Sequence, residues 1–197
     1  MDQLDFRGMN CPQPVMETRG YLDKHPGTQA LCVTVDNRAA SENVSRYLAS
    51  RGFQAEIRES GKDFQVLGNS TGEACECAVF DPANLERTTL VMITHNTIGT
   101  GSLELGAKLM VSFIKTLGEI KESLWRLVFV NEGVKLTVEG SETYPLLAEL
   151  ESQGVSILVC GTCLDFFGLV ERKKAGQTTN MLDIMTSLQV ASKVINI

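Results

Sequence analysis

The residues of this 197-residue chain best suited to chemistry are its six cysteines, Cys11, Cys32, Cys75, Cys77, Cys160 and Cys163. Cys11 stands directly before Pro12 and two residues before Pro14. Proline is tolerated in the first turn of a helix, where amide hydrogens have no intrahelical partner, so the two prolines predict a helix start with Cys11 at or beside its N-cap. The residue before a proline is extended, and the helix dipole and free N–H groups stabilise a thiolate at this end. We therefore expect Cys11 to be a reactive thiol and not a buried side chain that only fills space.

Cys160 and Cys163 form a second candidate site because they have the spacing C-x-x-C. They directly follow the apolar run Val155–Val159, which predicts a strand, and open α/β sheets bind ligands at the carboxyl ends of their strands. In such a pair one thiol can attack a sulfur atom and the other can resolve the product. A structural zinc half-site is an alternative, but zinc needs two further ligands, and only Cys75 and Cys77 could supply them.

The remaining cysteines are weaker candidates for a functional role. Cys75 and Cys77 lie in a run of small and acidic residues, where they could relay sulfur between domains, although an incidental role is the preferred interpretation. Cys32 lies inside a β-rich run and is predicted to be part of a core.

A turn with two glycines, Gly99 and Gly101, separates a predicted strand from a helix that begins at Ser102. Such helix starts can bind anions, but the spacing is not that of a dinucleotide site, because the next glycine is Gly106. A tight βα turn with Ser102 as the N-cap is the simpler interpretation. We also keep the hypothesis that His95 and the amides of this turn border the Cys160 pocket and stabilise a thiolate or persulfide.

The elements that must position Cys11 alternate between short strands and helices. The sequence predicts strands and helices, in the order βαβαββ, at Leu4–Phe6, Pro14–Asp23, Ala30–Val35, Ala40–Arg51, Phe53–Arg58 and Asp63–Leu67. This order predicts a two-layer α/β sandwich over residues 1–67. Residues 68–87 lack a sustained period and are predicted to be a linker.

The rest of the chain, residues 88–197, has the pattern of a parallel sheet. Its predicted strands and helices are Thr89–Thr94, Ser102–Leu117, Trp125–Val130, Tyr144–Ser152, Val155–Val159, Met181–Val190 and Lys193–Ile197. In the first of these helices, four apolar residues recur at every fourth position: Leu105, Leu109, Phe113 and Leu117. Strands that alternate with helices imply βαβ crossovers and an open, flavodoxin-like or Rossmann-like parallel sheet.

Composition narrows the function classes. A net charge of −6 and a pI of about 5.0 argue against a nucleic-acid partner, which demands clustered Lys and Arg. No run approaches the roughly 20 apolar residues of a membrane span, and the acidic, polar N-terminus lacks the features of a secretory signal. We therefore expect a cytoplasmic protein without membrane contact, in which cysteines are thiols and not structural disulfides.

The stretch Leu4-Asp5-Phe6-Arg7-Gly8-Met9-Asn10-Cys11-Pro12-Gln13-Pro14 resembles the TusA/SirA-like sulfur carriers, whose signature is a short strand, an Arg-Gly pair and a Cys-Pro-x-Pro helix start. The resemblance covers residues 1 to about 67. It implies that Cys11 carries a persulfide sulfur, received from one protein and passed to another.

Residues 88–197, with Cys160 and Cys163 followed by Leu164-Asp165-Phe166-Phe167-Gly168-Leu169, resemble the DsrE-like sulfur-relay domains. Both cysteines match the segment that bears that family's acceptor, with a slight preference for Cys160. The whole arrangement is similar to the YedF family of sulfurtransferase-like proteins of selenium metabolism. The resemblance implies sulfur-donor and sulfur-acceptor proteins as partners and a homo-oligomer.

The sequence thus predicts a sulfur carrier or sulfurtransferase-like protein. Attack by a thiolate on a sulfane sulfur needs no metal or organic cofactor, so none is predicted. Selenium as the cargo, a redox-sensing regulatory module and a zinc-binding structural protein remain alternatives. Enzymatic turnover and a single transfer per encounter are both compatible with the sequence.

Overall fold

The computed structural model describes residues 1–71, 89–120 and 122–197. The chain divides into two compact units, Met1–Asp81 and Pro82–Ile197. Most of the predicted linker, residues 68–87, lies outside the described residues. Its first residues were assigned wrongly, because the last strand of the first unit continues to Ser70. The domain boundaries at 67 and 88 otherwise stay predictions.

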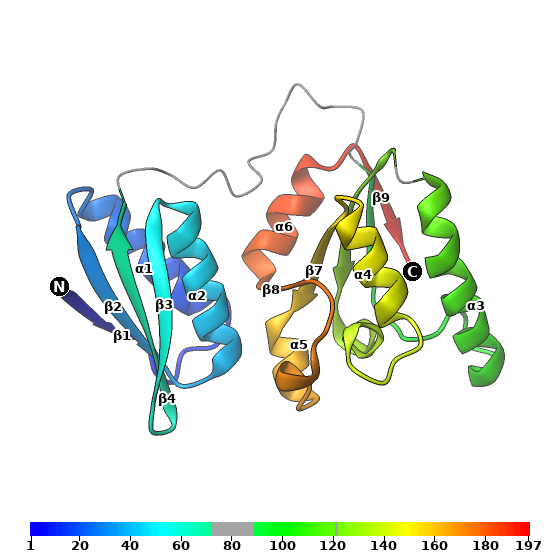
Figure 1. Cartoon of the computed structure of the whole chain (residues 1–197), viewed down its shortest axis with the longest axis horizontal. Helices are drawn as coiled ribbons and strands as arrows, with labels where there is room; N and C mark the ends of the chain where they lie inside the picture. Colours follow the sequence, from blue (N-terminus) through cyan, green and yellow to red (C-terminus); the bar gives the residue numbers. More distant parts are fainter. Residues whose placement is uncertain (72–88, 121) are drawn as a thin grey trace. The chain divides into compact units, whose positions relative to one another are not determined.

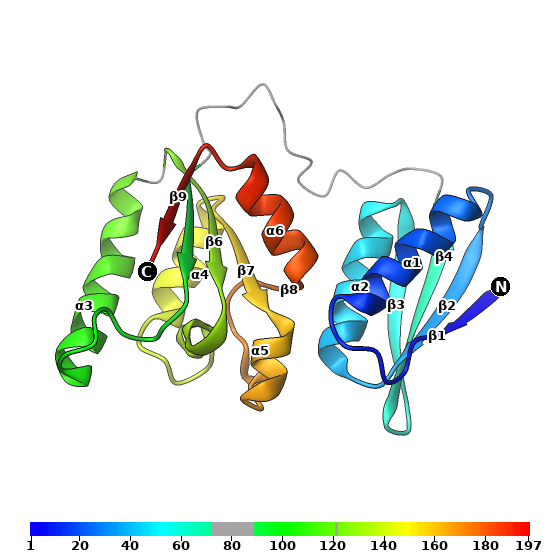
Figure 2. The same cartoon turned by 180° about the vertical axis from the view of Figure 1, so that it is seen from behind.

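The first unit has the predicted order βαβαββ. Its elements are β1 (Asp2–Asp5), α1 (Gln13–Lys24), β2 (Ala30–Val35), α2 (Arg38–Ser50), β3 (Phe53–Ser60) and β4 (Asp63–Ser70). The sheet has the strand order β1-β2-β4-β3, in which β1 and β2 are parallel and the other pairs antiparallel. Figures 1 and 2 show both helices on the same face of this sheet. The unit is therefore the two-layer α/β sandwich that the sequence predicts.

Strand β1 begins and ends earlier than the predicted Leu4–Phe6. Pairing with β2 starts at Asp2 and ends at Asp5, and Phe6 still donates its N–H to the carbonyl of Thr34 at 2.9 Å. Backbone pairing with a buried neighbouring strand, and not the apolar pattern of the edge strand itself, sets these limits.

The second unit is built on a parallel sheet. Its strands and α-helices are β5 (Thr89–Ile93), α3 (Leu103–Thr116), β6 (Leu124–Phe129), α4 (Tyr144–Ser152), β7 (Ser156–Cys160), α5 (Gly161–Phe166), β8 (Gln177–Thr179), α6 (Met181–Val190) and β9 (Lys193–Asn196). Within residues 89–120 and 122–197, 3₁₀ helices lie at η1 (Leu117–Ile120), η2 (Asn131–Thr137) and η3 (Val170–Arg172). The strand order is β8-β7-β6-β5-β9, and every pair is parallel. Figures 1 and 2 show α4 on one face of this sheet and α6 on the other, which confirms the predicted open parallel sheet.

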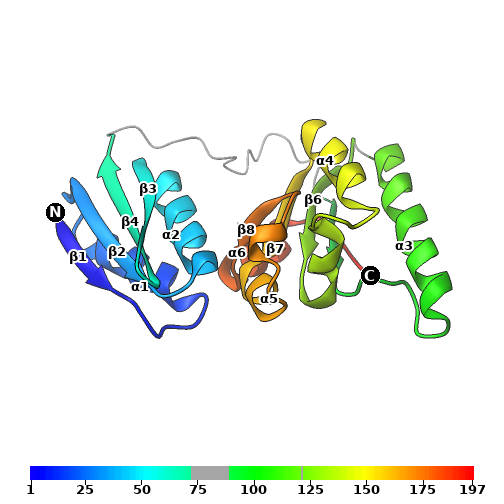
Figure 3. The ribbon, with the colours of Figure 1, turned by 60° about the horizontal axis from the view of Figure 1, so that its bottom comes forward.

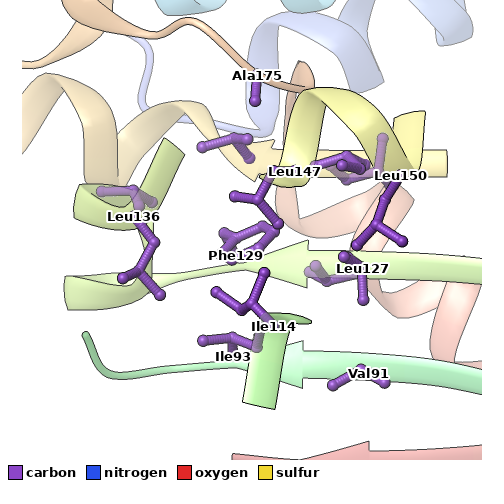
Figure 4. Close-up of a cluster of buried hydrophobic side chains, with 14 of the residues drawn as sticks. Val91, Ile93, Ile114, Leu127, Phe129, Leu136, Leu147, Leu150 and Ala175 are labelled. Atoms are coloured by element: carbon purple, nitrogen blue, oxygen red, sulfur yellow. The ribbon is translucent and has the colours of Figure 1, made fainter. Parts of the chain in front are cut away.

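The core of the second unit is centred on the strands that lead to the cysteine pair. Phe129, the last residue of β6, is fully buried and lies between Leu147 of α4 and Ile114 of α3 (Figure 4). Side chains from β5 and β7 pack in the same cluster. The ends of β6 and β7 are therefore fixed by packing, so the residues that follow them start from rigid positions.

The second unit differs from prediction by one residue at the bounds of β6 and β7, and more substantially in β8 and α3. Strand β8 was missed because it is only three residues long and polar, and its burial comes from pairing with β7. In α3, Leu105 and Leu109 of the predicted stripe are exposed, whereas Met110 and Ile114 are buried. The buried face includes Gly106, where a side chain would collide with the preceding loop, so close contact with that loop selects the face. Ser102 is the N-cap of α3, as predicted, and accepts a hydrogen bond from the N–H of Leu105 at 3.3 Å.

Among the helices formed by the described residues, none is both long enough and apolar enough to cross a membrane.

Candidate thiol sites

Cys160 and Cys163 lie at the carboxyl edge of the parallel sheet, as predicted. Cys160 is the last residue of β7 and the N-cap of the short helix α5, and Cys163 lies within the first turn of that helix. Figure 3 turns this edge of the second unit toward the viewer, with α5 at the end of β7. The segment that follows β6 reaches the same edge, because β6 and β7 are parallel neighbours.

The two thiols differ in burial and in hydrogen bonding. Cys160 is 4% exposed, whereas Cys163 is half-buried. The Cys163 Sγ accepts a hydrogen bond from the backbone N–H of Asn131 at 3.1 Å and a second from the thiol of Cys160. The Cys160 hydrogen bond is the larger cause, and together with the Asn131 bond it outweighs burial and lowers the pKa of Cys163 to about 6. Cys163 is therefore mostly a thiolate at neutral pH, and the geometry favours it over Cys160 as the nucleophile.

Asn131 is a site residue that sequence reasoning missed. It follows β6 directly and has a φ of 49°, in the left-handed region that asparagine tolerates better than most residues. Two residues later, Gly133 approaches the carbonyl of Ile93 so closely that a Cβ would collide with it. The N–H of Val130 also donates to that carbonyl, at 3.1 Å. This tight turn against the end of β5 aims the Asn131 N–H at Cys163, and an Asn-x-Gly sequence after a buried strand was the available signal.

Charged and aromatic side chains surround the turn. Lys135 pairs with Glu132 at 2.6 Å and holds its Nζ 4.5 Å from the centre of the Phe167 ring. The hydrogen bond and charge of Lys135 lower the pKa of Glu132, with a smaller contribution from His95. Phe167 immediately follows α5, so these contacts connect the segment after β6 to the helix that carries Cys163.

The residues of the predicted pocket are only partly brought to this edge. His95 is exposed, lies 2.8 Å through its Nδ1 from the hydroxyl of Thr94, and is close enough to influence Glu132 electrostatically. Gly99 and Gly101 are exposed, with open space where a side chain would stand. Their part in stabilising a thiolate or persulfide stays a prediction.

Cys11 lies on a loop fixed by charges. Arg7 pairs with Asp5 at 2.6 Å and with Asp63 at 3.1 Å. Hydrogen bonds from Arg7 lower the pKa of Asp5 to about 2, and the two carboxylates raise the pKa of Arg7. Gly8, with a φ of 76°, donates its N–H to the carboxylate of Asp36 at 2.6 Å. The Arg-Gly pair thus ties the loop that leads to Cys11 to the ends of β1, β2 and β4.

The helix start beside Cys11 differs from the prediction in one respect. Pro12 is the N-cap of α1, so Cys11 lies just before it and is half-buried. The N–H of Gln13 donates to the carbonyl of Asn10 at 2.8 Å, and the N–H of Val15 donates to the carbonyl of Pro12 at 3.1 Å. These amides are therefore not the free donors that the sequence predicts, because the turn before the helix supplies their acceptors. Pro14, in the same turn, has no N–H to offer.

The other cysteines give no further site within the described residues. Cys32 is buried in β2, as predicted. Among the described residues, no group of three or more His, Cys, Asp or Glu side chains is placed to hold a metal ion. Cys75 and Cys77, which the zinc and relay hypotheses require, lie outside the described residues.

Fold and sites together define a two-unit α/β protein with a candidate thiol site in each unit. Residues 2–68 match the family model described as sulfurtransferase TusA, a match that includes Cys11, Pro12 and Pro14. The N-terminal part of the chain is thus a TusA/SirA-like domain, as the sequence resemblance implies. No curated protein matches the chain.

Three solved structures are similar to parts of the chain. A SirA-like protein from Desulfitobacterium hafniense has 24% identity and a TM-score of 0.33, over 35% of this chain and 96% of that one. The ychN protein from E. coli has 18% identity and a TM-score of 0.44, over 56% of this chain and 99% of that one. A protein of unknown function from Methanobacterium thermoautotrophicum has 20% identity and a TM-score of 0.44, with the same two coverages.

Proposed function

We propose that this protein accepts sulfane sulfur as a cysteine persulfide, on Cys11 and on Cys163, and passes it to partner proteins. The observation that carries the proposal is the match of residues 2–68 to the TusA family, whose members are sulfurtransferases, because it includes Cys11 and the prolines after it. The partners are a sulfur-donor protein and a sulfur-acceptor protein.

For the second unit we propose a DsrE-like role, and for the whole chain the two-domain arrangement of the YedF family. Cys163 is the proposed acceptor in this unit, although the family resemblance slightly favours Cys160. The support is the half-buried position of Cys163 and its two hydrogen-bond donors, compared with the 4% exposure of Cys160. A protein donor needs an accessible sulfur, and Cys160 does not present one.

The proposed step is a direct displacement. The acceptor thiolate attacks the outer sulfur of the donor's persulfide, a new S–S bond forms on Cys163, and the donor leaves as a thiolate. The Asn131 N–H and the Cys160 thiol stabilise the attacking anion before the step. This chemistry uses no metal or organic cofactor.

The test is sulfur loading of the full chain. The purified protein is incubated with a cysteine desulfurase and cysteine, and added sulfur is located by peptide mass spectrometry. We expect added sulfur on Cys11 and Cys163, loss of each label in Cys11→Ser and Cys163→Ser respectively, and no change in Cys32→Ala, which removes a buried thiol. Absence of sulfur from both sites, or labelling that persists in the double variant, would contradict the proposal.

Redox sensing is a second candidate function, and the hydrogen bond between Cys160 and Cys163 favours it. A sensor would form a 160–163 disulfide on oxidation and take up no sulfur under the same loading conditions. Selenium as cargo would use the same thiols, and the mass of the label separates it from sulfur when selenide is supplied. Metal analysis of the same sample tests the zinc alternative. A cytoplasmic location and self-association remain proposals.

A further inference from the structure

In the cysteine pair, the first sulfur along the chain is buried and the second is accessible. Cys160, the first thiol, is enclosed at the end of β7, and Cys163, one turn later, is the half-buried one. Their side chains are hydrogen-bonded. Cys160 is thus poorly placed to meet another protein but lies next to whatever Cys163 carries.

We propose that, when no acceptor takes the sulfur, Cys160 attacks the Cys163 persulfide, releases hydrogen sulfide and closes a Cys160–Cys163 disulfide. This inference rests on the proposed function, because it requires a persulfide on Cys163. It adds an activity to that of a carrier: reductive release of sulfide from stored sulfane sulfur.

The step balances without another reactant. The Cys160 sulfur forms a bond to the Cys163 Sγ, and the bond between that Sγ and the outer sulfur breaks. The outer sulfur leaves with the electron pair as hydrosulfide and takes up the proton lost by Cys160. The sulfane sulfur gains two electrons, and the two cysteines lose two when they become a disulfide.

The geometry supports attack at the inner sulfur. Cys160 has an extended backbone as the N-cap of α5, and the C-x-x-C spacing across a helix start is that of dithiols that open and close as disulfides. Cys160 and Cys163 are three residues apart at the start of α5 and their side chains interact, so the Cys163 Sγ is within reach of the Cys160 thiol. A second cycle would need an external dithiol to reduce the disulfide.

The test measures what becomes of a persulfide that has been loaded on Cys163. The full chain carrying Cys11→Ser is loaded with a cysteine desulfurase and cysteine and freed of both by gel filtration. Sulfide, Cys163 persulfide and the 160–163 disulfide are then measured over time. We expect one sulfide per disulfide, and in Cys160→Ser a persulfide that persists with release slowed at least tenfold.

Controls separate the two proposals. Cys160→Ala must behave as Cys160→Ser does, since either change removes the attacking sulfur, and circular dichroism verifies that both variants are folded. Cys32→Ala, a buried cysteine of the other unit, must release sulfide at the parent rate. Equal persistence of the persulfide with and without Cys160, or sulfide without disulfide, overturns the further inference and leaves the carrier function standing. Absence of Cys163 persulfide in every variant overturns both.

Discussion

Cys11 and Cys163 both lie at helix starts, but the contacts around the two cysteines differ. Beside Cys11, the amides of Gln13 and Val15 donate to backbone carbonyls, and ion pairs of Arg7 hold the preceding loop. Beside Cys163, a backbone N–H from another element and a buried thiol point at the sulfur itself. The printed contacts at the first site fix the path of the chain, and those at the second stabilise the charge of the Cys163 thiolate.

Cys163 shows that a donor from another element can support a thiolate at a helix start. In the second unit the donor comes from the segment after β6, which the parallel sheet brings beside the end of β7. Substitutions that act on one site and leave the other intact test how the two sites differ.

The largest effect is expected from Gly133→Ala. The new Cβ would collide with the carbonyl of Ile93, so the turn after β6 must move, at a cost of about 1–3 kcal/mol of unfolding free energy. The Asn131 N–H moves with it, so Cys163 alkylation at pH 7 should slow as well. Chemical denaturation and alkylation rates measure the two effects. Gly118→Ala is the matched control, since open space surrounds that position; equal effects of both changes would refute the assigned role of Gly133.

Cys160→Ala should raise the pKa of Cys163, because it removes the larger of the two hydrogen-bond causes of the low value. Each pKa unit above neutrality lowers the thiolate fraction at pH 7 about tenfold. Alkylation of Cys163 at pH 7 should fall accordingly, while that of Cys11 stays unchanged. Peptide mass spectrometry resolves the two rates. An unchanged rate at Cys163 would show that Cys160 does not support the thiolate.

Asn131→Val is expected to have a smaller effect on the same site. A β-branched residue resists positive φ, at a cost of about 1–3 kcal/mol, so the backbone N–H should shift away from Cys163. Asn131→Gly keeps the conformation and the N–H, and should retain the Cys163 pKa. If a titration gives Cys163 the same pKa in the valine and glycine variants, the Asn131 N–H has no role in stabilising the thiolate.

Arg7→Gln tests the other site and should have the smallest effect. Removing the guanidinium should raise the pKa of Asp5 from about 2 towards its ordinary value of 3.8, as measured by NMR titration. Since the folded-state pKa is the lower one, the contribution of this pair to stability is present above pH 4 and fades as the pH falls towards 2. The pair is exposed, so salt should weaken it. The pH profile of Cys163 alkylation should not change, and a change in it would contradict the independence of the two sites.

Both folds could be predicted from the sequence because strong local patterns specify them. The helices Tyr144–Ser152 and Met181–Val190 have the predicted bounds, and the apolar runs mark the buried strands. Strand β8 could not be predicted, since its polar residues are strand only through pairing with β7. Cys163 and Asn131 are 32 residues apart, and their contact depends on which strands become neighbours. Local sequence therefore identified the thiols but not the backbone donor to Cys163.

The pH dependence of Cys163 alkylation, followed by peptide mass spectrometry in the full chain with Cys11→Ser, tests whether Cys163 is a thiolate at neutral pH. Folding lowers the pKa of this thiol from 9.0 to about 6, so the thiolate stabilises the fold at high pH, and this contribution fades as the pH falls from 9 towards 6. The alkylation rate should follow the thiolate, with a midpoint near pH 6 and a plateau by pH 7.5. A midpoint near 9 would contradict the claim that Asn131 and Cys160 hold Cys163 as a thiolate.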